Sequence, residues 1–470
     1  MATGGAPVER LRGYLLQLPS AKRALLIAEL ERALLRGDDV PGGDLLLQEV
    51  RSSVRETGLR APRLGSAARL FFRPLEPFLI DDQSGTKHPA RIERASLQPI
   101  WDWICRDVVP EVGKRFSEAV TRALHHDGAA TCDHLIRPFQ DQAAARIRSM
   151  LHEIEADDKA RRRMIGQIGA PQALDVARDV LAILAGRDVL AVMASRLPGH
   201  IANLADAQLE QAKAIIDACK AGAEGLLPFA LIMVKGRLAS PWQLIRLAAG
   251  GAESDDVSRI AAAPYAIAVT ITLADIGRMV GELKADLKSG RNLAVTALLK
   301  CIHDAARGVR SELDLAVDSP WGRQLAAIRS EVSSALTTEI ESIPARVRRL
   351  LRPRPAGKAA TAARLDPIEV AETEALIGLL AACRHYAGEL AVSEVTLRAH
   401  TELQQYLDSG TRALVEGLRG GDPADRPFRQ SQVDAAVRFC ATVFGPQYAA
   451  VLGKAAEVAA NSERKTAVKA

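Results

Sequence analysis

Between residues 266 and 343, aliphatic side chains recur at intervals of three or four positions, and this spacing restricts the fold more than any other feature. A period of about 3.5 residues keeps one stripe of a helix facing a partner helix along its whole length. The pattern occurs three times, separated by short turns, and three long helices joined in this way fold back on one another. The sequence therefore predicts a long antiparallel helical bundle over about 266–343. The stripes are Val269, Leu273, Ile276, Val280, Leu283 and Leu287; Leu298, Ile302, Ala306, Val309, Leu313 and Val317; and Leu325, Ile328, Val332, Leu336, Ile340 and Ile343.

Composition supports an all-α protein with an aliphatic core. Of the 470 residues, 48% are hydrophobic but only 4% are aromatic, while the helix-favouring residues Ala, Leu and Arg are abundant. We expect a multi-helical body and a smaller C-terminal helical domain. The predicted segments are an N-terminal helical hairpin (1–60), an irregular segment rich in aromatic residues and proline (61–97), a helical body (98–345), a basic linker (346–365), a C-terminal helical domain (366–460) and a flexible tail (461–470).

Two local patterns refine this division. Asp366, Pro367 and Glu369 have the spacing of an N-cap, a first-turn proline and a capping-box partner, so a new helix is expected to start there. Gly445 and Pro446 are expected to kink or split the last helix. The C-terminal helices are predicted near 367–390, 393–419 and 431–459.

Aromatic residues are concentrated between Phe71 and Trp103, which hold five of the eighteen in the chain. Pro74 and Pro77 exclude a long helix or a central strand in this segment. The large side chains either pin an extended loop onto the helical body or form a docking surface, and we favour the first interpretation.

A nine-residue echo, RDVLAILAG followed by RDVLAVMAS, occupies 178–195. One uninterrupted helix would carry these copies on opposite faces and be apolar all round, which requires deep burial. Alternatively, Gly186 ends one helix as a cap and the second copy starts another.

Basic residues cluster between Ser342 and Leu365, where seven occur without any acidic residue, although the net charge of the whole chain is only +5. Such a cluster can bind nucleic acid or anionic headgroups, or it can be a solvated linker, which we favour. The candidate polyanion-binding residues are Arg346, Arg348, Arg349, Arg352 and Arg354.

One set of candidate metal ligands lies in the sequence LHHDGAATCDHL. The ligands would be His125, His126, Cys132 and His134, but no pair has the four-residue spacing of a preformed helical site. A turn between helices is the simpler interpretation, so we predict no metal and no cofactor.

Catalytic motifs are missing from the sequence. The pairs Cys301–His303 and Cys383–His385 are two residues apart, which places their side chains about 200° apart on a helix and excludes a dyad within one helix. Phosphate-binding glycine motifs, a nucleophile elbow and the HExxH motif are absent. We therefore name no catalytic residue.

Cellular location is suggested by the cysteines and by the apolar runs. The six cysteines have no paired spacing, which favours reduced thiols in the cytoplasm. No export signal is visible, and no apolar run reaches the roughly 20 residues of a transmembrane helix. The apolar stretch 225–250 can lie on a membrane or be buried, and we prefer burial. The abundance of Ala and Arg suggests a bacterial genome rich in G and C.

These observations favour a cytoplasmic protein-interaction or scaffold module that acts through a protein partner or as a homo-oligomer. One alternative is a nucleic-acid or anionic-membrane binder that uses the basic segment 346–364. The other is an enzyme of unfamiliar type with a pocket between helices, near His125 to His134.

Overall fold

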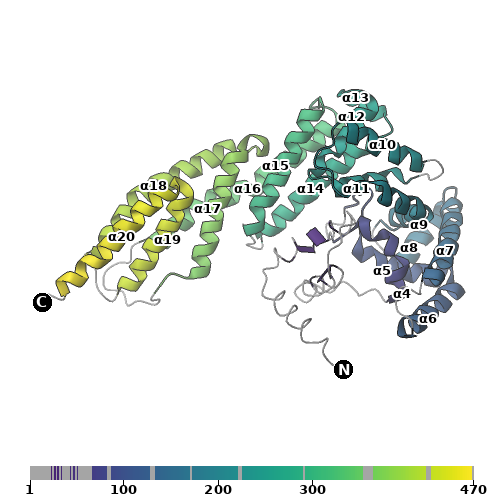
Figure 1. Ribbon diagram of the computed structural model, residues 1–470, viewed down its shortest axis with the longest axis horizontal. Coiled ribbons are helices and arrows are strands. Elements are labelled where there is room, and N and C mark those ends of the chain that lie inside the picture. Colours follow the sequence, from purple (N-terminus) through teal and green to yellow (C-terminus); the bar gives the residue numbers. More distant parts are fainter. Residues whose placement is uncertain are drawn as a thin grey trace. The chain divides into compact units, whose positions relative to one another are not determined.

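The computed structural model confirms the all-α fold class (Figure 1). Among the described residues, the only strands are β1 (Leu79–Ile80) and β2 (Ile92–Glu93), which pair in parallel. Each helix among the described residues is too short or too polar to cross a membrane. The structure describes residues 66–81, 86–126, 133–169, 172–220, 225–288, 292–352, 364–419 and 425–467, and isolated positions between Arg23 and Val50. The predicted hairpin over 1–60 therefore lies almost wholly outside the described residues.

The chain forms two compact units. Unit 1 combines Met1–Asp275 with Gly308–Leu315, and unit 2 combines Ile276–Arg307 with Ala316–Ala470. The boundaries of these two units differ from the linker expected at 346–365.

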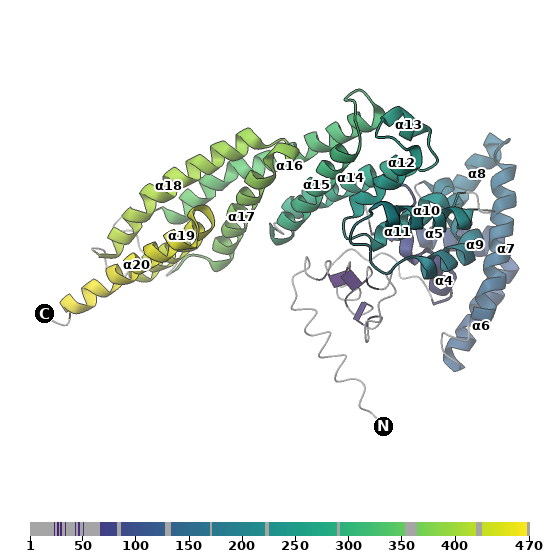
Figure 2. The same cartoon turned by 45° about the horizontal axis from the view of Figure 1, so that its top comes forward.

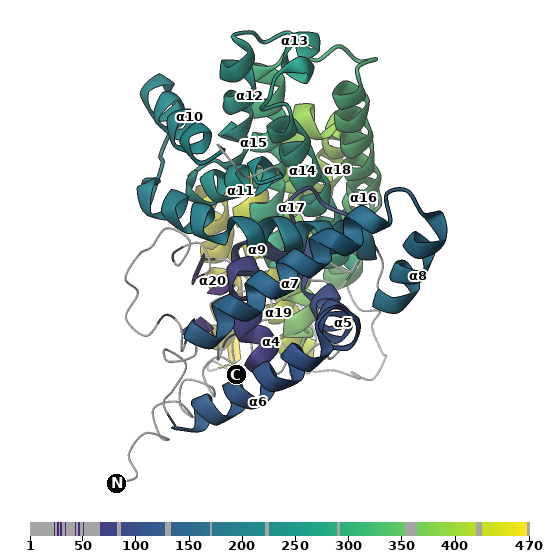
Figure 3. The ribbon, with the colours of Figure 1, turned by 90° about the vertical axis from the view of Figure 1, so that its right-hand side faces the viewer.

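Unit 1 combines long helices, such as α7 and α9, with shorter helical segments. The long helix α7 packs across α9, with α6 against α7 and α8 against α9 (Figure 3). The elements are α4 (Ser66–Phe71), η1 (Arg73–Phe78), η2 (Arg94–Ser96), α5 (Leu97–Trp103), η3 (Ile104–Val108), α6 (Pro110–His126), α7 (Asp133–Glu153), α8 (Asp158–Ile168), α9 (Ala173–Arg196), α10 (Asp206–Lys220), α11 (Leu227–Arg237), η5 (Pro241–Leu244), α12 (Ile245–Ala252) and α13 (Val257–Ala262).

The aromatic segment is pinned to the body of unit 1 by burial of its rings. Phe71, Phe72 and Trp103 are completely buried. The Phe71 ring lies 5.1 Å from that of Phe139 on α7. The buried amide of Gln140, also on α7, donates a hydrogen bond of 2.7 Å to the carbonyl oxygen of Phe71. The structure therefore supports the pinning interpretation of these rings.

Helix α9 contains both copies of the nine-residue echo without a break. Gly186 lies inside this helix, and a Cβ atom there would be only 2.2 Å from Cδ1 of Leu226. The glycine therefore permits a close contact and does not end the helix. Leu184 and Leu190, from the two copies, are both buried. Phe229 to Val234 of α11 are also buried, as expected for a core helix.

The three predicted bundle helices correspond to α14 (Ile267–Lys288), α15 (Asn292–Glu312) and α16 (Pro320–Leu351). All residues of the first and third stripes are buried. The second stripe is only partly buried: Leu298 is half-buried, and at its other end α15 stops at Glu312 and Val317 is 82% exposed. Residues of α14 and α15 belong to both units, and an antiparallel bundle of the three helices stays a prediction.

Helix α16 continues past Pro344, where the sequence predicts its end. Proline removes one helical hydrogen bond, but the residues around it lie on a continuous buried face that includes Ile340, Val347 and Leu350. Burial of this face offsets the lost bond. The first part of the expected linker is therefore helical, and residues 353–363 lie outside the described residues.

Unit 2 packs α16 against α17 (Pro367–Leu390) and α18 (Ser393–Arg419), and α18 against α19 (Arg426–Phe444) and α20 (Pro446–Ala467) (Figure 2). Asp366 caps α17 as expected, accepting a hydrogen bond of 2.9 Å from the amide of Ile368. Gly445, with φ of 96°, separates α19 from α20. Helix α20 runs to Ala467, so the chain is still helical beyond residue 461, where a flexible tail is expected from the polar sequence.

Acid is expected to destabilise unit 2 through His400. This α18 side chain is 7% exposed, and its Nε2 lies 3.3 Å from Nη1 of Arg384 on α17. Burial, and then the charge of Arg384, lower the pKa of His400 from 6.5. Below pH 6.5, His400 binds a proton more readily in the unfolded chain than in the folded chain, so the free energy of unfolding of unit 2 falls as the pH drops. Urea unfolding at pH 7 and 5 measures this loss.

A matched pair of variants isolates the contribution of His400. We expect His400→Gln to reduce the pH dependence, whereas His385→Gln, at an exposed position of α17, leaves it unchanged. Equal pH dependence in His400→Gln and the wild type would contradict this assignment.

Candidate binding pocket

Unit 1 contains a pocket of about 320 Å³ between η1, α7, α9 and α11. The α9 residues that line it are spaced by three and four positions, so they form one stripe of the helix. The lining residues are Arg73, Pro74, Pro77 and Phe78 of η1; Ile136, Arg137 and Gln140 of α7; Arg187, Leu190, Ala191 and Ala194 of α9; and Met233 of α11.

The floor of the pocket is apolar and well supported. Phe78, Leu190 and Met233 are buried, and the Phe78 ring lies 5.1 Å from the Phe229 ring behind it. Proline at two positions of η1 fixes the backbone that presents Phe78. Ala191 is exposed, so the pocket is accessible from its α9 side. This arrangement can hold an apolar group without rearrangement of the helices.

Arg187 gives the pocket a positively charged wall. Its Nη2 donates to Oδ1 of Asp141 at 2.7 Å, and its Nη1 donates to the carbonyl oxygen of Leu184 at 2.7 Å. Its Nε is buried and has no hydrogen-bond partner among the described residues, and the side chain is only 12% exposed. Arg187 therefore adds positive charge to the pocket wall, while its Nε is enclosed by protein atoms.

Further arginines add to the positive charge. Arg137, on the rim, pairs with Asp188, and both side chains are exposed. Arg237 is 3% exposed and donates to the carbonyl oxygens of Ala194 and Met233, at 2.9 Å and 3.0 Å. It has no carboxylate partner in the described part of the chain, and burial lowers the pKa of its guanidinium. The pocket thus combines an apolar floor with excess positive charge.

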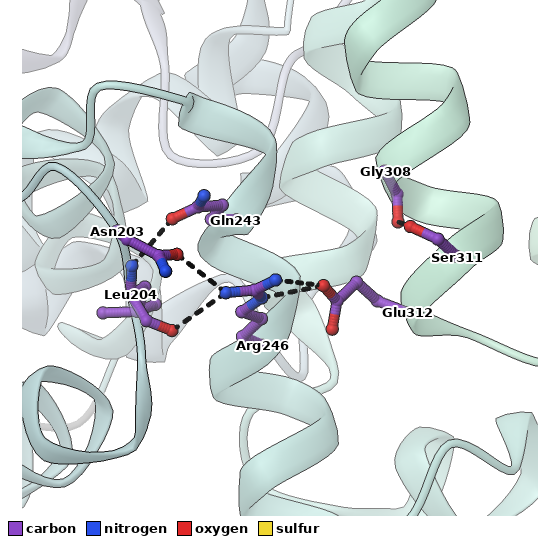
Figure 4. Close-up of polar contacts among 7 residues, drawn as sticks. All are labelled: Asn203, Leu204, Gln243, Arg246, Gly308, Ser311 and Glu312. Atoms are coloured by element: carbon purple, nitrogen blue, oxygen red, sulfur yellow. Dashed lines mark hydrogen bonds and ion pairs between the residues drawn. The ribbon is translucent and has the colours of Figure 1, made fainter.

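A second polar cluster in unit 1 surrounds Arg246 and is structural (Figure 4). Arg246 donates to Oε1 of Glu312 through Nε at 2.8 Å and to Oδ1 of Asn203 through Nη1 at 2.9 Å. Trp242 stacks under the guanidinium, and Gly308 leaves room for the indole, because a Cβ there would lie 2.3 Å from it. All three guanidinium nitrogens have protein partners, so the cluster fastens neighbouring segments together.

The predicted metal ligands are not brought together by the described residues. The side chains of His125, His126 and Cys132 lie outside the described part, and His134 is exposed at the start of α7. No group of three or more His, Cys, Asp or Glu side chains in the described ranges can hold a metal ion.

The predicted polyanion-binding residues lie on or beside α16. Arg348 pairs with Glu402 and Arg349 pairs with Glu369. Arg346 is half-buried and Arg352 is exposed, while Arg354 lies outside the described residues. Two of the five arginines therefore have their charge balanced within unit 2, and polyanion binding stays a prediction.

The cysteines of the excluded dyads are Cys301, which is exposed, and Cys383, which is buried, and neither forms a disulfide in the described part of the chain. Burial raises the pKa of Cys383 to about 12, so this thiol stays protonated at neutral pH. A protonated, buried thiol is a poor nucleophile.

No protein-family model, curated protein or solved structure matches the chain. Function is therefore inferred from the chemistry of the pocket.

Proposed function

We propose that this chain is a protein-interaction module that anchors an apolar side chain of a partner protein in the pocket of unit 1. The observation that carries the proposal is the preformed apolar floor of Phe78, Leu190 and Met233 beneath an accessible opening. Interfaces between proteins gain most of their affinity from a few side chains that fill such pockets.

The size of the pocket favours a partner side chain over a free small molecule. Sites for small molecules typically measure about 300–1,000 Å³ and bury most of the ligand surface. This pocket, at about 320 Å³, is at the lower limit of that range and is open beside the exposed Ala191. One or two side chains of a peptide fit it, while the rest of the peptide stays on the surface.

Filling the pocket tests the proposal. We expect Ala191→Trp to abolish the enrichment of peptides from a displayed random library panned against the full chain, because the indole occupies the space of the anchor. Ala191→Ser is the matched control and is expected to enrich the same peptides as the wild type. Both substitutions are at an exposed position, so the thermal unfolding midpoint should change little. Equal enrichment on the wild type and Ala191→Trp would contradict the proposal.

The proposal includes the location expected from the sequence, the cytoplasm of a bacterium. The scattered cysteines and the abundance of Ala and Arg support that part.

A further inference from the structure

We infer that the partner segment is acidic, with a carboxylate beside its apolar anchor, and that Arg187 recognises this carboxylate. The inference rests on the proposed function and names the chemistry of the partner. Its own support comes from the hydrogen bonds and charges of the pocket wall, whereas the apolar floor carries the proposed function.

The first support is the guanidinium of Arg187, which lines the pocket. Its fork of donors matches the two oxygens of a carboxylate. A carboxylate of the partner can accept from Nη2 together with the exposed Asp141 or in its place, beside the apolar floor. The Nε is enclosed by protein atoms, so it is not the contact.

The second support is the ease with which the present ion pairs can be exchanged. Asp141, which pairs with Arg187, is 63% exposed, and Asp188, which pairs with Arg137, is 58% exposed. Both carboxylates can therefore turn into water when a carboxylate of the partner replaces or joins them at the arginines, and the Arg137–Asp188 pair, which is exposed on both sides, contributes little to stability. These aspartates compete with an acidic partner but do not exclude it.

The third support is the charge next to the wall. Arg237 is buried, is bonded to the backbone of Ala194 and Met233, and has no carboxylate partner in the part of the chain that the structure describes. A charge in such surroundings is weakly screened, so it attracts anions to the pocket and repels cations. Complementary charge of this kind selects partners.

The test uses the full chain, a displayed library of random peptides, the Ala191→Trp variant and three further variants. Arg187→Gln removes the charge and the fork, and Arg187→Lys keeps only the charge. Arg178→Gln is the matched control, because Arg178 is an exposed residue of the same helix, pairs with Asp175 and does not line the pocket. One enriched peptide and its Glu→Gln or Asp→Asn analogue are then compared by fluorescence anisotropy on each protein.

We expect peptides enriched on the wild type and on Arg178→Gln to carry an acidic residue beside an apolar one. Neutralising that residue should weaken binding to the wild type by about tenfold. On Arg187→Gln the two peptides should bind equally, and on Arg187→Lys the difference should be smaller than on the wild type.

Peptides that are enriched on the wild type but not on Ala191→Trp, and that carry no preferred acidic residue, would overturn this inference and leave the proposed function standing. A tenfold preference that persists on Arg187→Gln would overturn the role of Arg187. If the wild type enriched peptides no more strongly than Ala191→Trp does, the proposed function would be overturned. Calorimetric binding of decanoate without any peptide enrichment would overturn both, since the occupant would then be a free lipid carboxylate.

Discussion

Replacement of Phe71 by alanine is expected to lower the free energy of unfolding of unit 1 by about 3–5 kcal/mol. The Phe71 ring is completely buried and contacts the rings of Phe72, Trp101 and Phe139, at centroid distances of 5.0, 5.5 and 5.1 Å. Its removal leaves a cavity that cannot be refilled without displacement of these rings. Urea unfolding followed by tryptophan fluorescence measures the loss, and Trp101 is close enough to report it.

The control for Phe71→Ala is Phe444→Ala. Phe444 is a half-buried residue of unit 2 whose ring lies 4.6 Å from that of Tyr448. This substitution should leave the unfolding of unit 1 unchanged. A loss below about 1 kcal/mol in Phe71→Ala would mean that the aromatic segment is not anchored as the structure describes.

Lys235→Met is expected to have an effect of similar size. Lys235 of α11 and Asp275 of α14 form an ion pair in which the side chains are only 11% and 13% exposed. Loss of the lysine leaves the carboxylate buried without its cation, which typically costs about 3–5 kcal/mol. Urea unfolding of unit 1 again gives the measurement.

The double variant Lys235→Met/Asp275→Leu distinguishes the contribution of the ion pair from that of side-chain packing. Removal of both charges avoids an isolated buried carboxylate, so the double variant should be more stable than Lys235→Met alone. If the double variant were no more stable than the single variant, the lysine would act through its packing and not through its charge.

Much of the helical fold is predictable because local spacing determines it. The stripe of α16 and the cap at Asp366 depend on neighbours within a few turns, and both are confirmed by burial and by a hydrogen bond. Pro344 and Val317 show the limit of this approach. Tertiary burial carries α16 through the proline, and the heptad spacing continues to Val317 although α15 has already ended at Glu312.

The binding pocket could not be predicted from the sequence. Arg73, Arg137 and Arg187 are far apart in the chain, and no local pattern indicates that η1, α7 and α9 converge. The only local signal is the spacing of Arg187, Leu190, Ala191 and Ala194 along one face of a helix, which is common to most amphipathic helices. Long-range packing brings the three arginines to the lining of one pocket, so only the structure reveals the site.

The central claim is that a partner peptide occupies the pocket of unit 1, and methyl NMR of the methionines tests it most directly. The chain has six methionines, and among the lining residues of the pocket Met233 is the only one. With labelled methionine methyl groups and a saturating amount of a library-selected peptide, the Met233 signal should shift while the Met279 signal does not. A bound peptide that leaves the Met233 signal unchanged would contradict the claim.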